Sequence, residues 1–416
     1  MKIAISTIGS TGDVQPYLAL SLGLRDAGHD VKVISHPLHE ARFAQYDIPF
    51  AACGPEVTQE VLNEMLDKML STKNPVKQLK LLMEEAFFAE GEKFFTQAKA
   101  AFADREIALC HMVDFLGSEA AAQLDIPRIG GILAPAGIPT AYSVPPNFPN
   151  LGRWINPMLW GITNLVLKIV DRSANRYVGN LVEQRRTKVK GFHILSDELN
   201  LIAASPTLAP TYPDLPSHFK VTGPWFLQQE VVQPKQELVD FIAKHPQPVI
   251  VSFGSMGGSQ GPALTDIVLK ALKLTGRPAV IQSGYAGLFA ENTPSNIIFA
   301  DFVSHEWLFP HAACVVHHCG AGTTSAVAKA AVPHVPVTFI ADQPYFAKQA
   351  YDLGIAVKKQ WYFQISPESL AKRIDEACNN PIFKQNAVRI SHQIKQEDGI
   401  PKAIALIEEH FEKVFK

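Results

Sequence analysis

The sequence lacks the features that mark secreted, membrane-spanning or nucleic-acid-binding proteins. Its 416 residues include five cysteines, an odd number without regular spacing, which argues against a disulfide framework and for a reducing compartment. The net charge of −2 gives no electrostatic basis for binding nucleic acid. No apolar run reaches the ~18–20 residues that span a bilayer, and residues 1–6 predict a strand rather than a signal peptide. We therefore expect a cytoplasmic protein.

The longest apolar stretch, residues 157–170, is interrupted by Lys168. One interpretation is a core helix, or a helix that lines an apolar cleft. The other is a surface that touches a membrane peripherally or collects a lipophilic ligand. The stretch and its flanks contain Trp154, Trp160 and Leu165, which we take as candidate contacts to an apolar ligand.

The length suits two domains. Strands and helices alternate in both halves, which predicts an α/β fold made of two Rossmann-like, doubly wound parallel-sheet domains that face each other across a cleft. A segment with two prolines and no clear period separates the halves. We expect an N-terminal domain over residues 1–222, a linker over 223–235, a C-terminal domain over 236–395 and a final helical segment over 396–416.

The most informative segment runs from Asp301 to Gly354. A short β-rich run ends at Val316, a turn of small residues follows, and an Ala-rich helix is predicted from Ser325. A Gly-rich turn between a buried strand and a helix exposes backbone N–H groups that suit a phosphate or diphosphate. A second strand is predicted over 335–340, and Asp342 and Gln343 follow it, where ligands bind in doubly wound sheets.

Two motifs carry a resemblance to a known family. The turn reads HHCGAGTT and is followed by DQ, and the first strand is followed by GSTGDVQP. Both are similar to signatures of the nucleotide-sugar glycosyltransferases with the GT-B fold, in the branch of sterol glucosyltransferases, antibiotic glycosyltransferases and rhamnosyltransferases. That branch typically has HHGGAGTT, so Cys319 replaces a glycine. In this family the final helix crosses back onto the N-terminal domain.

The resemblance implies that Asp13 is the general base that removes a proton from the acceptor hydroxyl. Asp13 also lies where a helix cap is expected, and capping alone is the alternative interpretation. No histidine occurs between Ile8 and Pro16, so Asp13 is the only base that this loop offers.

The resemblance also implies a donor site in the C-terminal half. His318 aligns with a histidine that contacts the diphosphate, whereas we expect His317 to pack or orient the loop. Phe302 would lie against the base, the backbone of Val303 would bond to it, and His305 would approach the ribose. Asp342 and Gln343 would bind sugar hydroxyls, without deciding between glucose and another hexose. The remaining candidates for the diphosphate are Ser255, Gly320, Gly322, Thr323 and Thr324.

Two other kinds of site share some of these residue types. Cys314, His317, His318 and Cys319 have a composition that could bind zinc, but no second ligand pair lies at a zinc-ribbon spacing. No Asp-x-Asp motif occurs, so no metal is expected at the diphosphate. The loop at residues 9–12 lacks the third glycine of a dinucleotide site, so NAD is not expected either.

We therefore expect an inverting, metal-independent transferase that moves a sugar, glucose in the first instance, from a UDP-sugar to a hydroxyl of a sterol, lipid or aromatic aglycone. Two rival hypotheses stay open: a protein that binds a nucleotide sugar or a lipid without catalysis, and a nucleotide-sugar epimerase, which needs carboxylates from both domains around the hexose.

Overall fold

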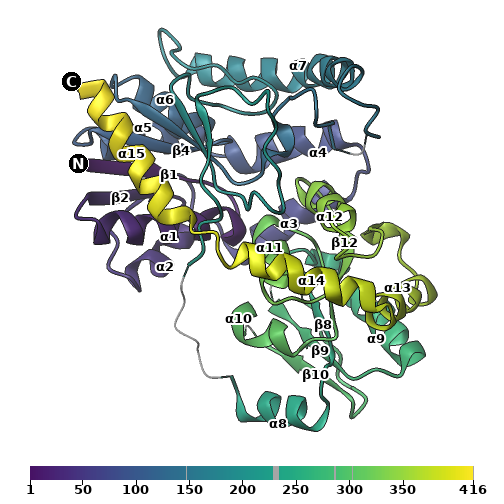
Figure 1. Ribbon diagram of the computed structural model, residues 1–416. Helices are drawn as coiled ribbons and strands as arrows, with labels where there is room; N and C mark the ends of the chain where they lie inside the picture. Colours follow the sequence, from purple (N-terminus) through teal and green to yellow (C-terminus); the bar gives the residue numbers. More distant parts are fainter. Residues whose placement is uncertain (147, 228–233, 285–286, 302, 416) are drawn as a thin grey trace. The chain divides into compact units, whose positions relative to one another are not determined.

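The structure is a computed structural model that describes residues 1–146, 148–227, 234–284, 287–301 and 303–415 (Figure 1). The chain divides into two compact units. Unit 1 comprises Met1–Pro206, Pro210–Gln228 and Asp398–Lys416, and unit 2 comprises Thr207–Ala209 and Gln229–Glu397. Each unit has one parallel sheet with helices on its faces, so the predicted fold class of two Rossmann-like α/β sheets is confirmed.

The sheet of unit 1 has the strand order β3-β2-β1-β4-β5-β6-β7. Because the order reverses between β1 and β4, the loops that follow these two neighbouring strands diverge and leave a site at the carboxyl edge. The strands are β1 (Lys2–Ser6), β2 (Asp30–Ser35), β3 (Phe50–Ala52), β4 (Ile107–His111), β5 (Arg128–Ile132), β6 (Leu199–Ile202) and β7 (Phe219–Val221).

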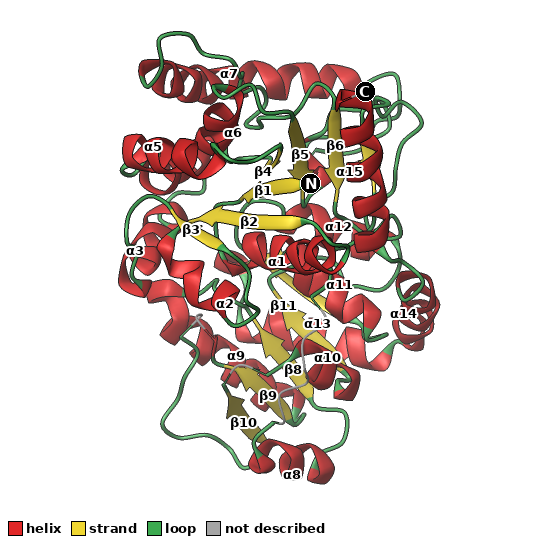
Figure 2. Cartoon of the chain, turned by 90° about the vertical axis from the view of Figure 1, so that its left-hand side faces the viewer, coloured by secondary structure: helices red, strands yellow, loops and turns green. Residues whose placement is uncertain are grey.

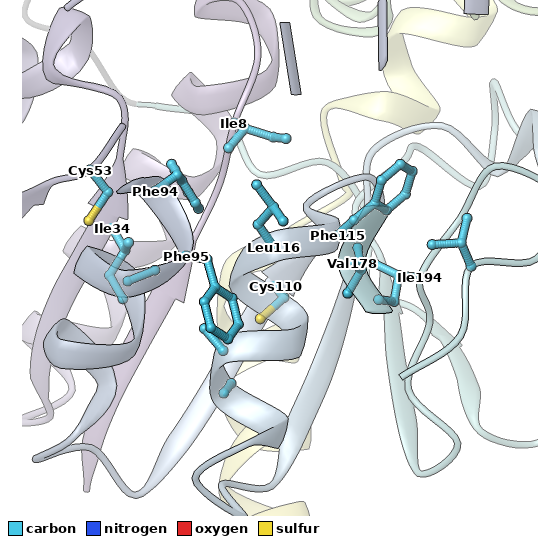
Figure 3. Packing of buried hydrophobic residues seen from close by; sticks show 14 of the residues in the cluster. Ile8, Ile34, Cys53, Phe94, Phe95, Cys110, Phe115, Leu116, Val178 and Ile194 are labelled. Atoms are coloured by element: carbon cyan, nitrogen blue, oxygen red, sulfur yellow. The ribbon is translucent and has the colours of Figure 1, made fainter. Parts of the chain in front are cut away.

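Two apolar layers cover the two faces of this sheet. One layer contains side chains of α1, α2 and α15, and the other contains side chains of α5, α6 and α7, part of which Figure 3 shows. The helices of unit 1 are α1 (Thr11–Asp26), α2 (Glu40–Ala44), α3 (Gln59–Leu70), α4 (Pro75–Leu82), α5 (Gly91–Phe102), α6 (Phe115–Ala122), α7 (Asn156–Asn180) and α15 (Gly399–Phe415).

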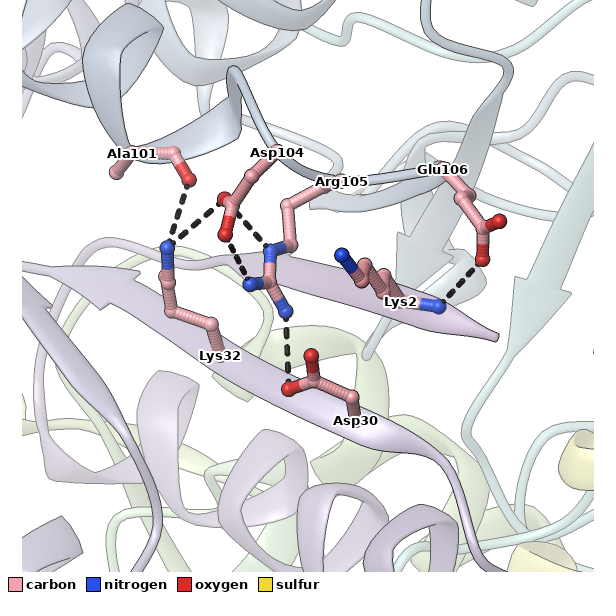
Figure 4. A network of polar contacts seen from close by, with 7 residues as sticks. All are labelled: Lys2, Asp30, Lys32, Ala101, Asp104, Arg105 and Glu106. Carbon is pink, nitrogen blue, oxygen red and sulfur yellow. Dashed lines mark hydrogen bonds and ion pairs between the residues drawn. The ribbon is translucent and has the colours of Figure 1, made fainter.

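A network of charges fixes the amino edge of the same sheet (Figure 4). Arg105 has a side chain only 6% exposed and pairs with Asp30 at the start of β2, 3.0 Å away. Lys32 of β2 binds Asp104 at 3.0 Å, and the backbone N–H of Lys2 donates to Glu106 at 2.7 Å. The α5–β4 loop is thereby tied to β1 and β2, at the edge opposite the one where a ligand would bind.

Unit 2 has the strand order β10-β9-β8-β11-β12-β13, and Figure 2 shows β8, β9, β10 and β11 as one twisted sheet. Its strands are β8 (Val249–Ser252), β9 (Ala279–Gln282), β10 (Ile297–Ala300), β11 (Cys314–His317), β12 (His334–Thr338) and β13 (Gln360–Trp361). Its helices are α8 (Gln236–Lys244), α9 (Gly261–Thr275), α10 (His305–Leu308), α11 (Ala321–Lys329), α12 (Gln343–Asp352), α13 (Pro367–Asn379) and α14 (Pro381–Ile394). The helix expected from Ser325 thus begins four residues earlier, at Ala321.

The last helix, α15, belongs to unit 1 and lies against α1 (Figure 1). Gly23 makes this contact possible, since a Cβ atom there would lie 2.4 Å from Cγ2 of Ile400 and 3.2 Å from Cδ1 of Ile404. The absence of a side chain at Gly23 therefore lets α15 approach the backbone of α1.

We predict that Gly23→Ala lowers the free energy of unfolding of unit 1 by about 1–2 kcal/mol, because overpacking outweighs the helix propensity that alanine adds. The matched control is Gly161→Ala in α7, where no atom lies within 4 Å of the added Cβ. The control should be neutral or stabilising by up to ~1 kcal/mol. Denaturant unfolding measures both, and equal effects would refute the close contact.

Candidate functional site

The donor-side candidates gather at the carboxyl edge of the sheet in unit 2, where its strand order reverses. β11 pairs with β8 in parallel, with His317 opposite Ser252. The turn after β8 contains Gly254 and Ser255, and the turn after β11 contains His318 and Gly320. Because the two strands are neighbours and run in the same direction, these turns meet at one place.

The imidazole of His318 lies between two glycines. A Cβ atom at Gly254 would be 3.0 Å from its Cε1, and one at Gly320 would be 2.7 Å from its Nε2. Its Nδ1 is buried and has no hydrogen-bond partner among the described residues. Burial lowers the pKa of His318 to about 4, so the ring is neutral at pH 7 and has one N–H to donate. A hydrogen bond with the backbone of Ser252 opposes the shift, and the ring lies at the mouth of a Gly-rich turn.

His317 has a structural environment, in line with the expectation that it packs or orients the loop. It is fully buried, and its Nε2 lies 2.9 Å from Nδ1 of His334 on β12. Its Nδ1 accepts a hydrogen bond from the backbone N–H of Cys319 at 3.2 Å. The ring therefore joins β11 to β12 and holds the first bend of the turn.

The backbone donors of the turn belong to the first turn of α11. Gly320 is the N-cap residue, and its carbonyl accepts the N–H of Thr324 at 2.9 Å. The N–H groups of Ala321, Gly322 and Thr323 have no acceptor within the helix and coincide with the positive end of its dipole. Gly322 is exposed, whereas the Thr324 side chain is fully buried. Thr324 thus contributes to the fold of the turn, and the preceding three residues present the donors.

Asp342 and Gln343 follow β12 and begin α12. Asp342 is the N-cap residue and half-buried. Gln343 is only 4% exposed, and its Oε1 accepts the backbone N–H groups of Phe339 at 2.7 Å and Ile340 at 3.2 Å. The carbonyl half of the amide therefore shapes the loop, which leaves Nε2 as the atom that can contact a ligand.

The stretch expected to bind a base is described in part. Phe302 lies outside the described residues. Val303 is buried and its carbonyl accepts from Nε2 of Gln282 at 2.9 Å. His305 stacks on Phe309, with ring centroids 4.3 Å apart, and burial lowers its pKa to about 4, with His318 nearby as the second cause. His305 is thus near the Gly-rich turn that follows β11.

In unit 1, Asp13 lies in the first turn of α1. Its Oδ2 accepts the backbone N–H of Ser10 at 2.8 Å and the Ser10 hydroxyl at 2.9 Å. Asp13 therefore does cap the helix, as the alternative interpretation holds. The carboxylate is nevertheless only half-buried and has a second oxygen, so a cap and a catalytic base are compatible roles.

Two histidines that the sequence reasoning did not single out surround the Asp13 loop. Nε2 of His39 lies 3.0 Å from the carbonyl oxygen of Gly9. His111 ends β4, the strand beside β1, and its buried Nδ1 has no hydrogen-bond partner among the described residues. Burial lowers the pKa of His111, and the carboxylate of Asp13 opposes that shift. The position of His111 at the end of a strand is the signal that could have identified it.

A narrow gap, too small to admit a water molecule, lies beside this loop. Figure 3 shows Ile8, Phe94, Phe115 and Leu116 gathered on one side of the sheet. They line the gap together with His36 and Asp114. Burial raises the pKa of Asp114 to about 6, and hydrogen bonds from Ser6 and Gly117 oppose the shift. The lining of the gap combines apolar side chains with two polar groups.

The three aromatic and aliphatic residues predicted to bind an acceptor do not lie together. Trp160 is 4% exposed and its Nε1 donates to the Ser143 carbonyl at 3.1 Å. Trp154 and Leu165 are 83% and 63% exposed. Trp160 is therefore buried, whereas Trp154 and Leu165 lie on the surface.

The zinc alternative has no geometric support within the described ranges. The Cys314 thiol faces Cys378, 3.5 Å away, while His317 faces His334. No group of three or more His, Cys, Asp or Glu side chains in those ranges is arranged to hold a metal ion. Nor does any helix in the same ranges have the length and apolar character needed to cross a membrane.

Comparison with known sequences finds a matching family in each half of the chain. Residues 3–129 match the glycosyltransferase family 28 N-terminal domain, and residues 281–408 match the C-terminal domain of erythromycin biosynthesis protein CIII-like proteins. The vancomycin aglycone glucosyltransferase of Amycolatopsis orientalis is 30% identical over 381 residues, which cover 86% of this chain and 85% of that protein.

The sterol 3-beta-glucosyltransferase of Komagataella phaffii is 26% identical over 99% of this chain, and this chain spans 34% of that enzyme's length. Among solved structures, the calicheamicin glycosyltransferase CalG4 superposes with a TM-score of 0.68 at 17% identity and covers 100% of this chain and 99% of its own. VinC in complex with DTDP gives 0.68 at 16% identity and covers 99% of this chain and 100% of its own. These two likenesses concern the fold.

Unit 2 contains four histidines whose pKa burial lowers: His305 and His318 to about 4, His334 to about 3, and His317 well below its ordinary value. An unfolded histidine has a pKa near 6.5, so the unfolded chain binds more protons below that pH. Their contribution to stability is therefore present above about pH 6.5 and lost as the pH falls toward about 4.

We accordingly predict that the melting temperature of unit 2 falls between pH 6.5 and pH 4.5. The variant His305→Phe keeps the stacking on Phe309 but cannot take up a proton, so it should reduce the pH dependence. His392→Gln replaces an exposed histidine on α14 and should behave like the wild type. Calorimetry across this range is the measurement, and a pH-independent melting temperature would contradict the assignment.

Proposed function

Because this chain belongs to the nucleotide-sugar glycosyltransferases of the GT-B fold, in the branch that holds sterol and antibiotic glucosyltransferases, we propose that it moves glucose from UDP-glucose to a hydroxyl of a lipophilic small molecule with inversion at the anomeric carbon. The observation that carries the proposal is the turn of unit 2, where the neutral ring of His318, held between two glycines, lies beside the first turn of α11.

The diphosphate is proposed to bind at this turn. The N–H groups of residues 321–323 and the N–H of His318 would donate to its oxygens. As the bond between the anomeric carbon and the diphosphate oxygen breaks, negative charge moves onto the leaving group. Donors aimed at that charge stabilise the transition state more than the ground state. A neutral imidazole suits this task, because it donates an N–H without requiring the low pH at which His318 would be charged.

Asp13 is proposed as the general base. Its carboxylate would take the proton of the acceptor hydroxyl while the acceptor oxygen attacks the anomeric carbon from the face opposite the diphosphate. One C–O bond forms, one C–O bond breaks, and the proton ends on Asp13, so the configuration inverts in a single displacement. The two hydrogen bonds from Ser10 occupy Oδ2 and orient the carboxylate, which leaves Oδ1 for the proton.

The sugar and the acceptor are assigned to different parts of the chain. Asp342 and Nε2 of Gln343 would bind hexose hydroxyls, because they follow β12 at the edge that carries the phosphate turn. The acceptor is assigned to unit 1, on the side of the Asp13 loop where Ile8, Phe94 and Asp114 line a narrow gap. The relatives' names indicate a sterol and the vancomycin aglycone as their acceptors, and a sterol would contact the apolar side chains of this lining. We propose that no resident metal takes part, since the sequence has no Asp-x-Asp motif.

The first test separates the two roles of Asp13. Asp13→Asn keeps an oxygen that can accept the N–H of Ser10, so the cap survives, but it cannot take a proton. We predict that transfer falls about 10²–10⁴-fold, while UDP affinity and the melting temperature stay near wild type. Transfer at the wild-type rate would show that Asp13 is only a cap. Asp13→Ala serves as the comparison that loses both roles.

The second test concerns the donor sugar. Gln343→Glu keeps Oε1 for the two backbone N–H groups, which also stabilise its charge at the start of a helix, but it removes the Nε2 donor. We predict that kcat/KM for UDP-glucose falls about 10- to 100-fold, with the acceptor KM and the stability little changed. Gln343→Ala should in addition destabilise unit 2, because the N–H groups of Phe339 and Ile340 lose their acceptor. An unchanged kcat/KM in Gln343→Glu would remove Gln343 from the sugar site.

A further inference from the structure

Helix α7 has an apolar surface that faces solvent. Met158, Ile162, Leu165 and Ile169 are 65%, 49%, 63% and 68% exposed, and Trp154, just before the helix, is 83% exposed. The spacings of four, four, three and four residues put these side chains on one side of the helix. We call these five residues the α7 stripe. Large side chains in an unbroken exposed row are unusual on a globular protein and mark an interaction surface.

The opposite side of α7 is already packed. Leu159, Trp160, Val170, Ala174 and Val178 are buried, and several of them belong to the apolar layer with α5 and α6. Figures 1 and 2 both show α7 as the outermost helix of this layer. One side of α7 therefore packs against the core of unit 1, and the α7 stripe lies on the other side of the helix.

Charge identifies the partner. The whole chain has a net charge of −2, yet the exposed charges on and beside the stripe are all positive. Arg172 and Arg176 continue the stripe through the last turns of α7, Lys168 lies at its border and Arg153 precedes it, and all four are exposed. The guanidinium of Arg153 lies 4.8 Å from the ring centroid of Trp154.

The acid that could offset these charges is turned inward. Asp171 is the one acidic residue between positions 148 and 180. It is 8% exposed, and its carboxylate accepts the backbone N–H groups of Gly191 and Phe192, both at 2.8 Å. The neighbouring helix α4, which packs against α7, adds the exposed Lys77 and Lys80, of which Lys80 pairs with the exposed Glu84 at 3.6 Å.

We propose that the α7 stripe docks this protein on an anionic membrane surface. The apolar side chains would enter the boundary between headgroups and acyl chains, and the long Arg and Lys side chains would extend to lipid phosphates. A tryptophan at the head of the stripe suits that boundary, since its ring is apolar and its N–H is polar. Such docking would place the enzyme where a lipophilic acceptor is dissolved, but it is a property of α7 that does not depend on transfer.

The test is flotation of the purified protein with vesicles of phosphatidylcholine, with or without phosphatidylglycerol. The wild type should bind the anionic vesicles, and more weakly as the salt concentration rises. Met158→Glu combined with Ile169→Glu should lower the partition coefficient about tenfold or more, and Arg172→Gln combined with Arg176→Gln should remove most of the preference for anionic lipid. The matched control is Leu274→Glu combined with Ile382→Glu in unit 2, where the two side chains are 60% and 57% exposed.

The control variant should float like the wild type, and circular dichroism and melting curves should show that every variant is folded. Wild-type protein that stays unbound, or equal binding by all variants, would overturn the proposal. Sedimentation velocity tests the competing occupant. If the wild type is a dimer that Met158→Glu with Ile169→Glu dissociates, and it binds no vesicles, the stripe is a contact between copies and the proposal is wrong. Assays of UDP release with a water-soluble acceptor report on transfer separately.

Discussion

The pairing of β8 with β11 is the constraint on which the donor side of this protein depends. These strands are not consecutive in the chain, yet the switch in strand order makes them neighbours. Two turns that are remote in sequence then share one small space. The ring of His318 fits there only because Gly254 and Gly320 have no Cβ. The same strand order also sets the places of the first turn of α11 and of the loop after β12. Because β12 lies directly beside β11, both segments lie at the same edge of the sheet.

Cys319 shows how the same turn tolerates a departure from the family pattern. Its φ of 67° lies in the left-handed region, where glycine is unstrained and other residues are disfavoured by roughly 1–2 kcal/mol. This explains the glycine of the usual HHGGAGTT pattern. Here the thiol is fully buried and the backbone N–H is bonded to His317. Burial of the side chain and this hydrogen bond offset part of the strain, so the turn keeps its shape.

Much of the fold could be predicted from the sequence, because parallel strands buried on both faces are short apolar runs with turn residues after them. The two motifs also identified the carboxyl edges at which Asp13 and His318 lie. Contacts between side chains on different strands and loops could not be predicted from the sequence. The order of residues does not show that His111 ends the strand beside β1. Nor does it show that the side-chain oxygen of Gln343 accepts backbone hydrogen bonds of its own loop. The inward side chain of Thr324, next to the exposed Gly322, was equally hidden.

Helix α7 marks the limit of pattern reading most clearly. Its sequence is apolar around most of its circumference over the first turns, and the structure gives this one helix both a buried and an exposed apolar face. Trp160 packs in the core, whereas Leu165 faces solvent. Hydrophobic periodicity locates an apolar face of a helix by its contrast with a polar face. A helix with apolar side chains on both faces has no such contrast. Charge distinguishes the two faces. The cationic side chains continue the outer stripe, whereas the carboxylate of Asp171 lies on the inner side and accepts two backbone hydrogen bonds.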